Sequence, residues 1–244
     1  RDHYDYCEIH PALILGVLAN AIPSLSMNQA PRNQFSASHF KQTLGIYATN
    51  YRNRMDNKGQ ILHYTQQPIV KSKLAKYINF DNLPHGINAI VAIGCFSGYN
   101  QEDSIIFNLD SVKRGLFRST KFRTYSARDE IESNSAKEVI CRPNPDTVLN
   151  MKSGNYSKLD STGIIKENEK VDENDILIGK CVYSNEKDMQ GNKVVYDNSE
   201  YVRRGEEGYV DRVYSNLGND NQRYCKVRVR KDKIPEIGDK FASR

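Results

Sequence analysis

The sequence lacks any apolar run that approaches the roughly 20 residues a helix needs to span a bilayer. Its first ten residues, RDHYDYCEIH, lack both the apolar stretch and the small-residue cleavage site of a secretory signal peptide. These two absences argue against a membrane protein and a secreted one. We therefore expect an intracellular protein with no membrane partner.

The cysteines form no C-x-x-C pair, so their spacing predicts neither a zinc ribbon nor a disulfide framework. Reduced, structural thiols are the expected state. His10 and His63 have no partner at metal-ligand spacing, and the sequence contains no internal repeat. The cysteines are Cys7, Cys95, Cys141, Cys181 and Cys225.

The composition is that of ordinary globular protein. The 244 residues are 38% hydrophobic and 27% charged, with a mean hydropathy of -0.69, which suits one large or two modest domains. The formal charge of +5 and the pI near 8.8 fit an anionic partner. Many unrelated proteins share that charge, so it does not identify the partner.

The first part of the chain shows helical patterns. Apolar side chains at helical spacing predict a buried helix over residues 8–22. The sequence then predicts a loop through Arg32 and a second helix over residues 36–47. That second helix would place Lys41 and Gln42 in its middle.

Two apolar runs of strand length follow. Residues 87–96, INAIVAIGCF, predict a buried strand, and residues 104–108, SIIFN, predict another. Glu102 and Asp103 lie on the polar loop between them, where two strands would hold the carboxylates rigidly.

After Arg118 the sequence predicts a β-rich region. The expected strands cover residues 121–127, 136–142, 175–183 and 224–230. The mixed-charge stretches 166–175 and 184–208 predict solvated loops. In the last strand, Lys226, Arg228 and Arg230 alternate with Cys225, Val227 and Val229, so we expect one basic face and one apolar face.

Three separated strings carry a family resemblance: CEIHPALILG with NQAPRN and KQTLG, then NAIVAIGCFSGYNQEDSII with RGLFRS, and finally KVRVRKDKIPEIGDKFASR. Together they resemble the second-largest subunit of eukaryotic-type multisubunit DNA-directed RNA polymerases, the equivalent of the bacterial β subunit. The resemblance covers essentially the whole chain and is weakest over residues 127–207. Because the family motif GDKFASR continues beyond Arg244, we expect an internal fragment that is inactive alone.

The resemblance implies a mixed α/β, β-rich fold. Residues 1–15 would end the external region, and residues 16–118 would form the first part of the hybrid-binding region, which includes part of a double-psi β-barrel. Residues 119–234 would be the β-rich wall, or flap, insertion. Residues 235–244 would start the second part of the hybrid-binding region.

The same resemblance implies a site for nucleotide addition. Asp103 and Glu102 would approach the second Mg²⁺, the ion that arrives with the nucleoside triphosphate, in part through water. Arg32 would hold triphosphate oxygens, and Lys240 would lie near the nucleotide and the RNA 3′ end. The tightly bound Mg²⁺ belongs to the largest subunit, and no NADFDGD-like string occurs here.

Lys41 and Gln42 match positions that contact the RNA backbone of the RNA–DNA hybrid. Phe35 departs from the tyrosine usual in the family, so any hydroxyl contact is lost there. Lys226, Arg228 and Arg230 suit a surface that faces nucleic acid or another subunit. The implied partners are the largest and other polymerase subunits, the DNA template, the hybrid and nucleoside triphosphates.

A non-catalytic alternative stays open at this point, namely a degenerate or split copy that binds nucleic acid or polymerase partners. The two-barrel RNA-dependent polymerase of silencing pathways lacks support, because its Asp-rich string is absent. Richness in Asn, Lys, Ile and Tyr fits AT-rich coding DNA, such as that of a large DNA virus. The expected location is the nucleus for a cellular protein, or the virion or a viral factory for a viral one.

Overall fold

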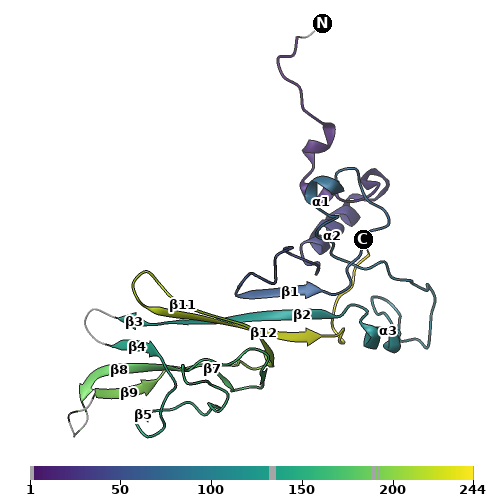
Figure 1. The fold of residues 1–244 in the computed structure, drawn as a ribbon. Helices are drawn as coiled ribbons and strands as arrows, with labels where there is room; N and C mark the ends of the chain where they lie inside the picture. The colour runs from purple at the N-terminus through teal and green to yellow at the C-terminus, as the bar shows by residue number, and fades with distance from the viewer. Residues whose placement is uncertain (1–2, 132–135, 188, 190, 192, 244) are drawn as a thin grey trace. The chain divides into compact units, whose positions relative to one another are not determined.

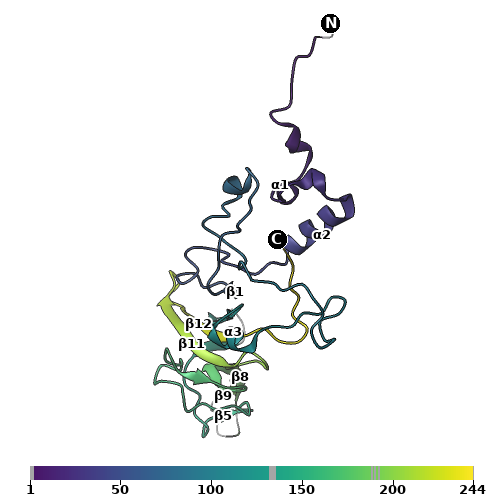
Figure 2. The ribbon, with the colours of Figure 1, turned by 90° about the vertical axis from the view of Figure 1, so that its right-hand side faces the viewer.

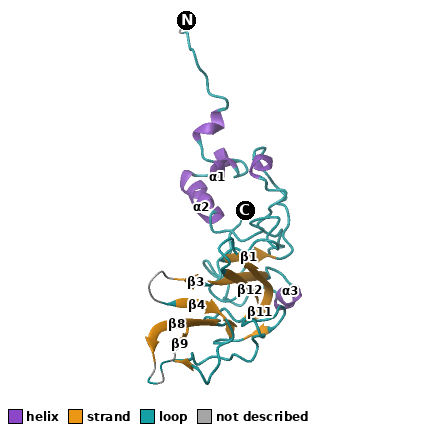
Figure 3. Ribbon diagram, turned by 60° about the vertical axis from the view of Figure 1, so that its left-hand side comes forward, coloured by secondary structure: helices purple, strands orange, loops and turns teal. Residues whose placement is uncertain are grey.

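The structure, a computed structural model, describes residues 3–131, 136–187, 189, 191 and 193–243. Its internal contacts divide the chain into two units. Unit 1 consists of residues 1–52, 60–119 and 234–244, and unit 2 of residues 53–59 and 120–233. Unit 1 contains the helices and much irregular chain, whereas unit 2 is built mainly from strands (Figures 1 and 3). A mixed, β-rich fold is thus confirmed.

The helix predicted over residues 8–22 is wrong in extent and in burial. The chain forms a 3-10 helix, Pro11–Ile14, and then α1, Val17–Asn20, with extended backbone at Gly16 between them (Figure 1). The Asn20 amide stabilises this break by donating to the carbonyls of Ala12, Leu15 and Gly16. In the described chain no helix is long and apolar enough to cross a membrane.

Helix α2 begins and ends earlier than predicted, since it spans Ala30–Phe40. Pro31 occupies its first turn, where a missing N–H costs nothing. The Thr43 hydroxyl donates to the Phe40 carbonyl at 2.8 Å and helps to end the helix. Lys41 and Gln42 therefore follow the helix rather than lying in its middle.

Neither apolar run around Glu102 forms a strand. Residues 87–96 and 104–108 lie in irregular backbone, and Ile90, Val91 and Ile93 are exposed rather than buried. Helix α3, Leu109–Arg114, begins directly after the second run, with Asn108 as its N-cap. The prediction of two buried strands is wrong because no neighbouring strand in the described chain pairs with either run.

The described strands form three sheets, with the strand orders β1-β2-β12-β11-β6, β3-β4-β8-β9-β5 and β10-β7. Strands β11 and β12 form a long antiparallel pair, seen side by side in Figure 2. The strand bounds are β1 Lys58–Leu62, β2 Ser119–Arg128, β3 Glu130–Ile131, β4 Lys137–Ile140, β5 Val148–Leu149, β6 Lys170–Val171, β7 Ile176–Ile178, β8 Lys180–Lys187, β9 Lys193–Asp197, β10 Glu200–Tyr201, β11 Gly208–Leu217 and β12 Arg223–Lys233.

The strands expected after Arg118 are confirmed as β2, β4, β7 with β8, and β12. The stretches expected to be loops are not wholly loops. Stretch 166–175 contains β6, and stretch 184–208 contains β9, β10 and the end of β8. Positions 188, 190 and 192 of the second stretch lie outside the described residues.

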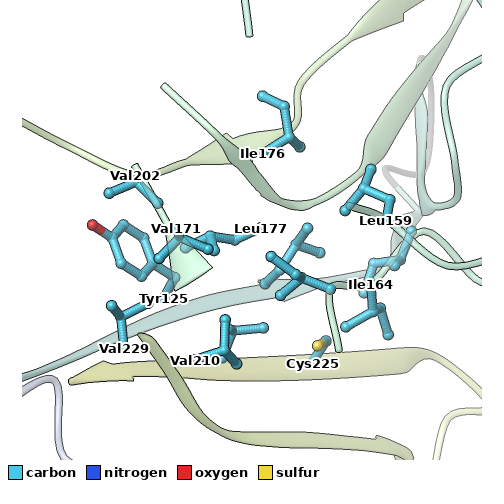
Figure 4. Packing of buried hydrophobic residues seen from close by; sticks show 14 residues of the cluster. Tyr125, Leu159, Ile164, Val171, Ile176, Leu177, Val202, Val210, Cys225 and Val229 are labelled. Atoms are coloured by element: carbon cyan, nitrogen blue, oxygen red, sulfur yellow. The ribbon is translucent and has the colours of Figure 1, made fainter. Parts of the chain in front are cut away.

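The core of unit 2 gathers buried side chains from β2, β6, β7, β11 and β12 (Figure 4). Every residue of β7 is fully buried, and Cys225, Val227 and Val229 of β12 point into the same cluster. Burial of this much apolar surface is the main source of stability for the unit. Gly163 is required at its edge, because a Cβ there would lie 2.3 Å from the Cys141 carbonyl carbon.

Candidate functional site

The Glu102–Asp103 pair lies on an irregular loop in unit 1, directly after residues 94–100, a segment closed by hydrogen bonds of one side chain. The Asn100 side chain donates to the Gly94 carbonyl at 2.6 Å and accepts from the Phe96 amide at 2.9 Å. These two hydrogen bonds tie together chain positions four and six residues apart. The loop therefore has a defined shape without strands on either side.

The backbone at Glu102 adopts the left-handed conformation, with φ of 56°. This conformation is uncommon for a residue with a Cβ. The turn is stabilised because the Ser104 amide donates to the Gln101 carbonyl at 3.2 Å. Both carboxylates are exposed, and within the described chain neither forms an ion pair.

A cluster of three phenylalanines, Phe107, Phe117 and Phe241, joins this region to the C-terminal segment of unit 1. The Phe241 ring lies 4.8 Å from Phe107 and 4.9 Å from Phe117, between ring centroids. Such edge-on and tilted contacts are favourable for aromatic rings. Exposed Lys240 directly precedes Phe241, and Phe107 follows Asp103 by four positions.

Arg32 lies in the first turn of α2 and is exposed. Its guanidinium carbon is 5.7 Å from the centre of the Phe35 ring, within range of a cation–π contact. The ring thus takes a packing role that needs no hydroxyl. An exposed guanidinium suits a phosphate ligand, because its donors form a planar fork.

Lys41 and Gln42 are exposed at the end of α2. The preceding residue, Phe40, anchors that end by edge contacts with Phe80 at 5.5 Å and with His85 at 4.7 Å. Burial lowers the pKa of His85, so this imidazole stays neutral near pH 7. The two polar side chains therefore project from an anchored helix end.

The basic face predicted for β12 is interrupted at Arg228. Its side chain is 3% exposed and pairs with Asp211 at 2.6 Å, and its guanidinium also donates to the Arg54 carbonyl and stacks on Phe122. This arginine is committed to internal contacts, so the structure does not support a nucleic-acid contact by Arg228. Lys226 and Arg230 are half-buried, and Arg230 also reaches Asp211.

Comparison with known proteins shows the family of the chain. The family model for RNA polymerase Rpb2, domain 6, matches residues 18–244. The chain belongs to this family. It is 44% identical to DNA-directed RNA polymerase II subunit 2 of Arabidopsis thaliana over all of this chain, and 47% identical over 99% of it to DNA-directed RNA polymerase II subunit RPB2 of Encephalitozoon cuniculi. It is 38% identical over its whole length to DNA-directed RNA polymerase subunit Rpo2 of Sulfolobus acidocaldarius.

The Rpb2 domain 6 chain spans only about a fifth of the length of these relatives, namely 21%, 21% and 22%. The recognition of the family from its three sequence strings is confirmed. The comparisons name polymerase subunits of eukaryotes and of an archaeon and assign no residue a role.

The part of the Rpb2 domain 6 chain that the structure describes does not by itself build a complete metal site. Within the described residues no group of three or more His, Cys, Asp or Glu side chains could hold an ion. Two exposed carboxylates nevertheless suit Mg²⁺, which prefers hard oxygen ligands and keeps several waters. Glu102 and Asp103 therefore have the donor chemistry that part of a Mg²⁺ site needs.

Sequence reasoning missed the residues that hold this site together. It singled out Glu102, Asp103 and Lys240, but not Asn100 or Phe241. Both missed residues lie inside the strings GYNQED and GDKFASR, so position in a motif was an available signal. The contacts they make with Gly94 and Phe107 could not be read from spacing.

Proposed function

We propose that this chain works within the second-largest subunit of a DNA-directed RNA polymerase and takes part in template-directed RNA synthesis. Support comes from the family, and from relatives named as polymerase subunits that are similar along essentially the whole chain. The activity belongs to the multisubunit enzyme, with this chain supplying residues to it. Nucleus is the proposed location for a cellular enzyme, and a viral factory for a viral one.

The domain assignment is part of the proposal. Residues 16–118 and 235–244 form the hybrid-binding region with part of a double-psi β-barrel, and residues 119–234 form the wall. Unit 2 begins its long segment at Thr120 and ends it at Lys233, which supports a separate wall inserted into unit 1.

The observation that carries the proposed site is the contact between Phe241 and Phe107. It brings an exposed lysine, Lys240, to the chain that follows the exposed Glu102–Asp103 pair. A lysine and two carboxylates in one unit suit a nucleoside triphosphate bound with a divalent ion, since the ligand presents both signs of charge. A surface that bound protein alone would not require this pairing.

Each side chain then has a distinct task. Asp103, with Glu102, holds the ion that accompanies the triphosphate, directly or through water. Lys240 places a mobile positive charge near the triphosphate and the RNA 3′ end, and Arg32 holds two phosphate oxygens with its fork of donors. When bound, the divalent ions stabilise the attacking and leaving oxygens of the transfer.

Contacts with nucleic acid complete the proposal. Lys41 and Gln42 touch the RNA backbone of the RNA–DNA hybrid, and Lys226 and Arg230 face nucleic acid or a neighbouring subunit. The largest subunit supplies the tightly bound Mg²⁺. Nucleotide addition thus needs both chains.

The test is Asp103→Ala in the complete polymerase, with Asp110→Ala as control. Asp110 is also an exposed carboxylate but lies in the first turn of α3. We expect Asp103→Ala to cut single-nucleotide addition by roughly a hundredfold or more with normal assembly, and Asp110→Ala to leave it unchanged. Normal addition by Asp103→Ala would instead favour a non-catalytic binding module.

A further inference from the structure

One side chain fastens residues 94–100, the part of the loop that leads into Glu102 and Asp103. The Asn100 side-chain nitrogen donates to the Gly94 carbonyl, and its side-chain oxygen accepts from the Phe96 amide. Both bonds run to main-chain atoms, so they fix the path of the backbone rather than the rotamer of a neighbour. The Asn100 side chain is half-buried, and its two bonded partners, Gly94 and Phe96, are exposed.

The loop needs such a fastening because it contains several unfavourable conformations. Ser97 and Glu102 both have positive φ, of 57° and 56°. Each costs on the order of 1 kcal/mol for a residue with a Cβ. The apolar runs on either side form no strand in the described chain, so no sheet holds the ends.

Asn100 precedes Glu102 by two residues, so its bonds fix the backbone from which the Glu102–Asp103 turn begins. The Gln101 side chain reaches back to Cys95 at 3.9 Å, a weak contact that follows the same direction. The Gln101 carbonyl accepts from both the amide and the hydroxyl of Ser104. Hydrogen bonds thus restrain the backbone on both sides of Glu102 and Asp103, through Asn100 before them and through Ser104 after them.

We propose that Asn100 is a positioning residue that holds Glu102 and Asp103 in the geometry needed to receive the triphosphate-bound Mg²⁺. This inference rests on the proposed function of the two carboxylates. Among the described residues, the Asn100 side chain bonds to main-chain atoms of Gly94 and Phe96. Its contribution acts through the loop, as residues behind metal ligands commonly do.

The test measures single-nucleotide addition by the complete polymerase as a function of Mg²⁺ concentration, scaled to the fraction of active enzyme. Asn100→Ala should raise the Mg²⁺ concentration for half-maximal rate by about tenfold. High Mg²⁺ should recover much of the rate. Asn88→Ala is the matched control, since it removes a similar bond from an asparagine side chain to the Gln67 carbonyl, outside the 94–104 loop.

A double substitution separates positioning from a general loss of structure. If Asn100 acts through the carboxylates, Asn100→Ala should cost little further activity in an Asp103→Ala enzyme, because the residues act as one unit. Full, additive losses would overturn the inference. So would an Asn100→Ala enzyme with the Mg²⁺ dependence of Asn88→Ala.

The two proposals fail differently. An Asp103→Ala enzyme with normal Mg²⁺ dependence would remove the proposed function and this inference together. An impaired Asp103→Ala enzyme beside an unaffected Asn100→Ala enzyme would remove only the role of Asn100.

Discussion

The ring of Phe241 lies 4.8 Å from the ring of Phe107, although the two residues are far apart in sequence. One follows Lys240 directly, and the other follows Asp103 by four residues. This contact, together with Phe117, makes the C-terminal segment part of unit 1. Residues of opposite charge are thereby held in one region by apolar packing.

Phe241→Ala should weaken nucleotide addition through the position of Lys240. Loss of two ring contacts removes about 1–3 kcal/mol of packing, so the segment with Lys240 becomes less fixed. We expect a raised KM for nucleoside triphosphate in the complete polymerase. Tyr77→Ala, which truncates an exposed ring in the same unit, is the control. An unchanged KM in Phe241→Ala would contradict this role of the phenylalanine cluster.

Asp211→Ala should destabilise unit 2 strongly. It would leave the Arg228 guanidinium buried without its carboxylate, at a cost of about 3 kcal/mol. Glu130→Ala breaks the exposed pair with Arg128, which contributes little to stability because water screens it. Hydrogen exchange of the β11 and β12 amides in the complete subunit should rise clearly for Asp211→Ala only. Equal exchange in the two variants would show that the buried pair is not needed.

The Cys225 thiol should resist alkylation until high pH. Burial raises its pKa to about 12, above the value near 8.5 of an unfolded cysteine. Because the raised pKa favours the neutral thiol, its contribution to stability is present below about pH 8.5 and falls as pH rises toward 12. Iodoacetamide at about pH 8 should modify exposed Cys7 and leave Cys225 unmodified without denaturant. Modification of both at similar rates would contradict the burial of Cys225.

The strands of unit 2 could be predicted because their alternating apolar residues pack against other strands of the same unit. Cys225, Val227 and Val229 alternate with polar residues, and all three are buried against strands of the same unit. The stretch with β9 was missed because its charged and Asn-rich flanks resemble a loop. Pairing with β8, as in Tyr183 with Val195, overrides that composition.

The apolar run 87–96 shows the limit of such reasoning. Its β-branched residues predict burial, but Ile90 and Ile93 are exposed in this chain. Apolar composition indicates that these side chains favour burial. It does not show which part of the protein would cover them. The early end of α2 has a similar cause, because Phe40 is held by Phe80 and His85, which lie far along the chain.

The site residues were found through sequence strings rather than through physical pattern. Glu102, Asp103, Lys240 and Arg32 are exposed polar side chains, which composition alone cannot separate from ordinary surface. Arg228 shows the converse error. Alternation placed it on an open basic face, whereas Asp211 and Phe122 enclose it. No rule of alternation could identify a carboxylate on another strand as its partner.

The central proposal is that Glu102 and Asp103 hold the ion bound with nucleoside triphosphate and that Lys240 lies near the triphosphate. The direct measurement replaces Mg²⁺ by Fe²⁺ in the complete polymerase and maps radical cleavage of the chain with and without nucleoside triphosphate. Cleavage at residues 100–104 and near Lys240 that increases with the nucleotide is the predicted result. Nucleotide-dependent cleavage that spares both segments would contradict the account.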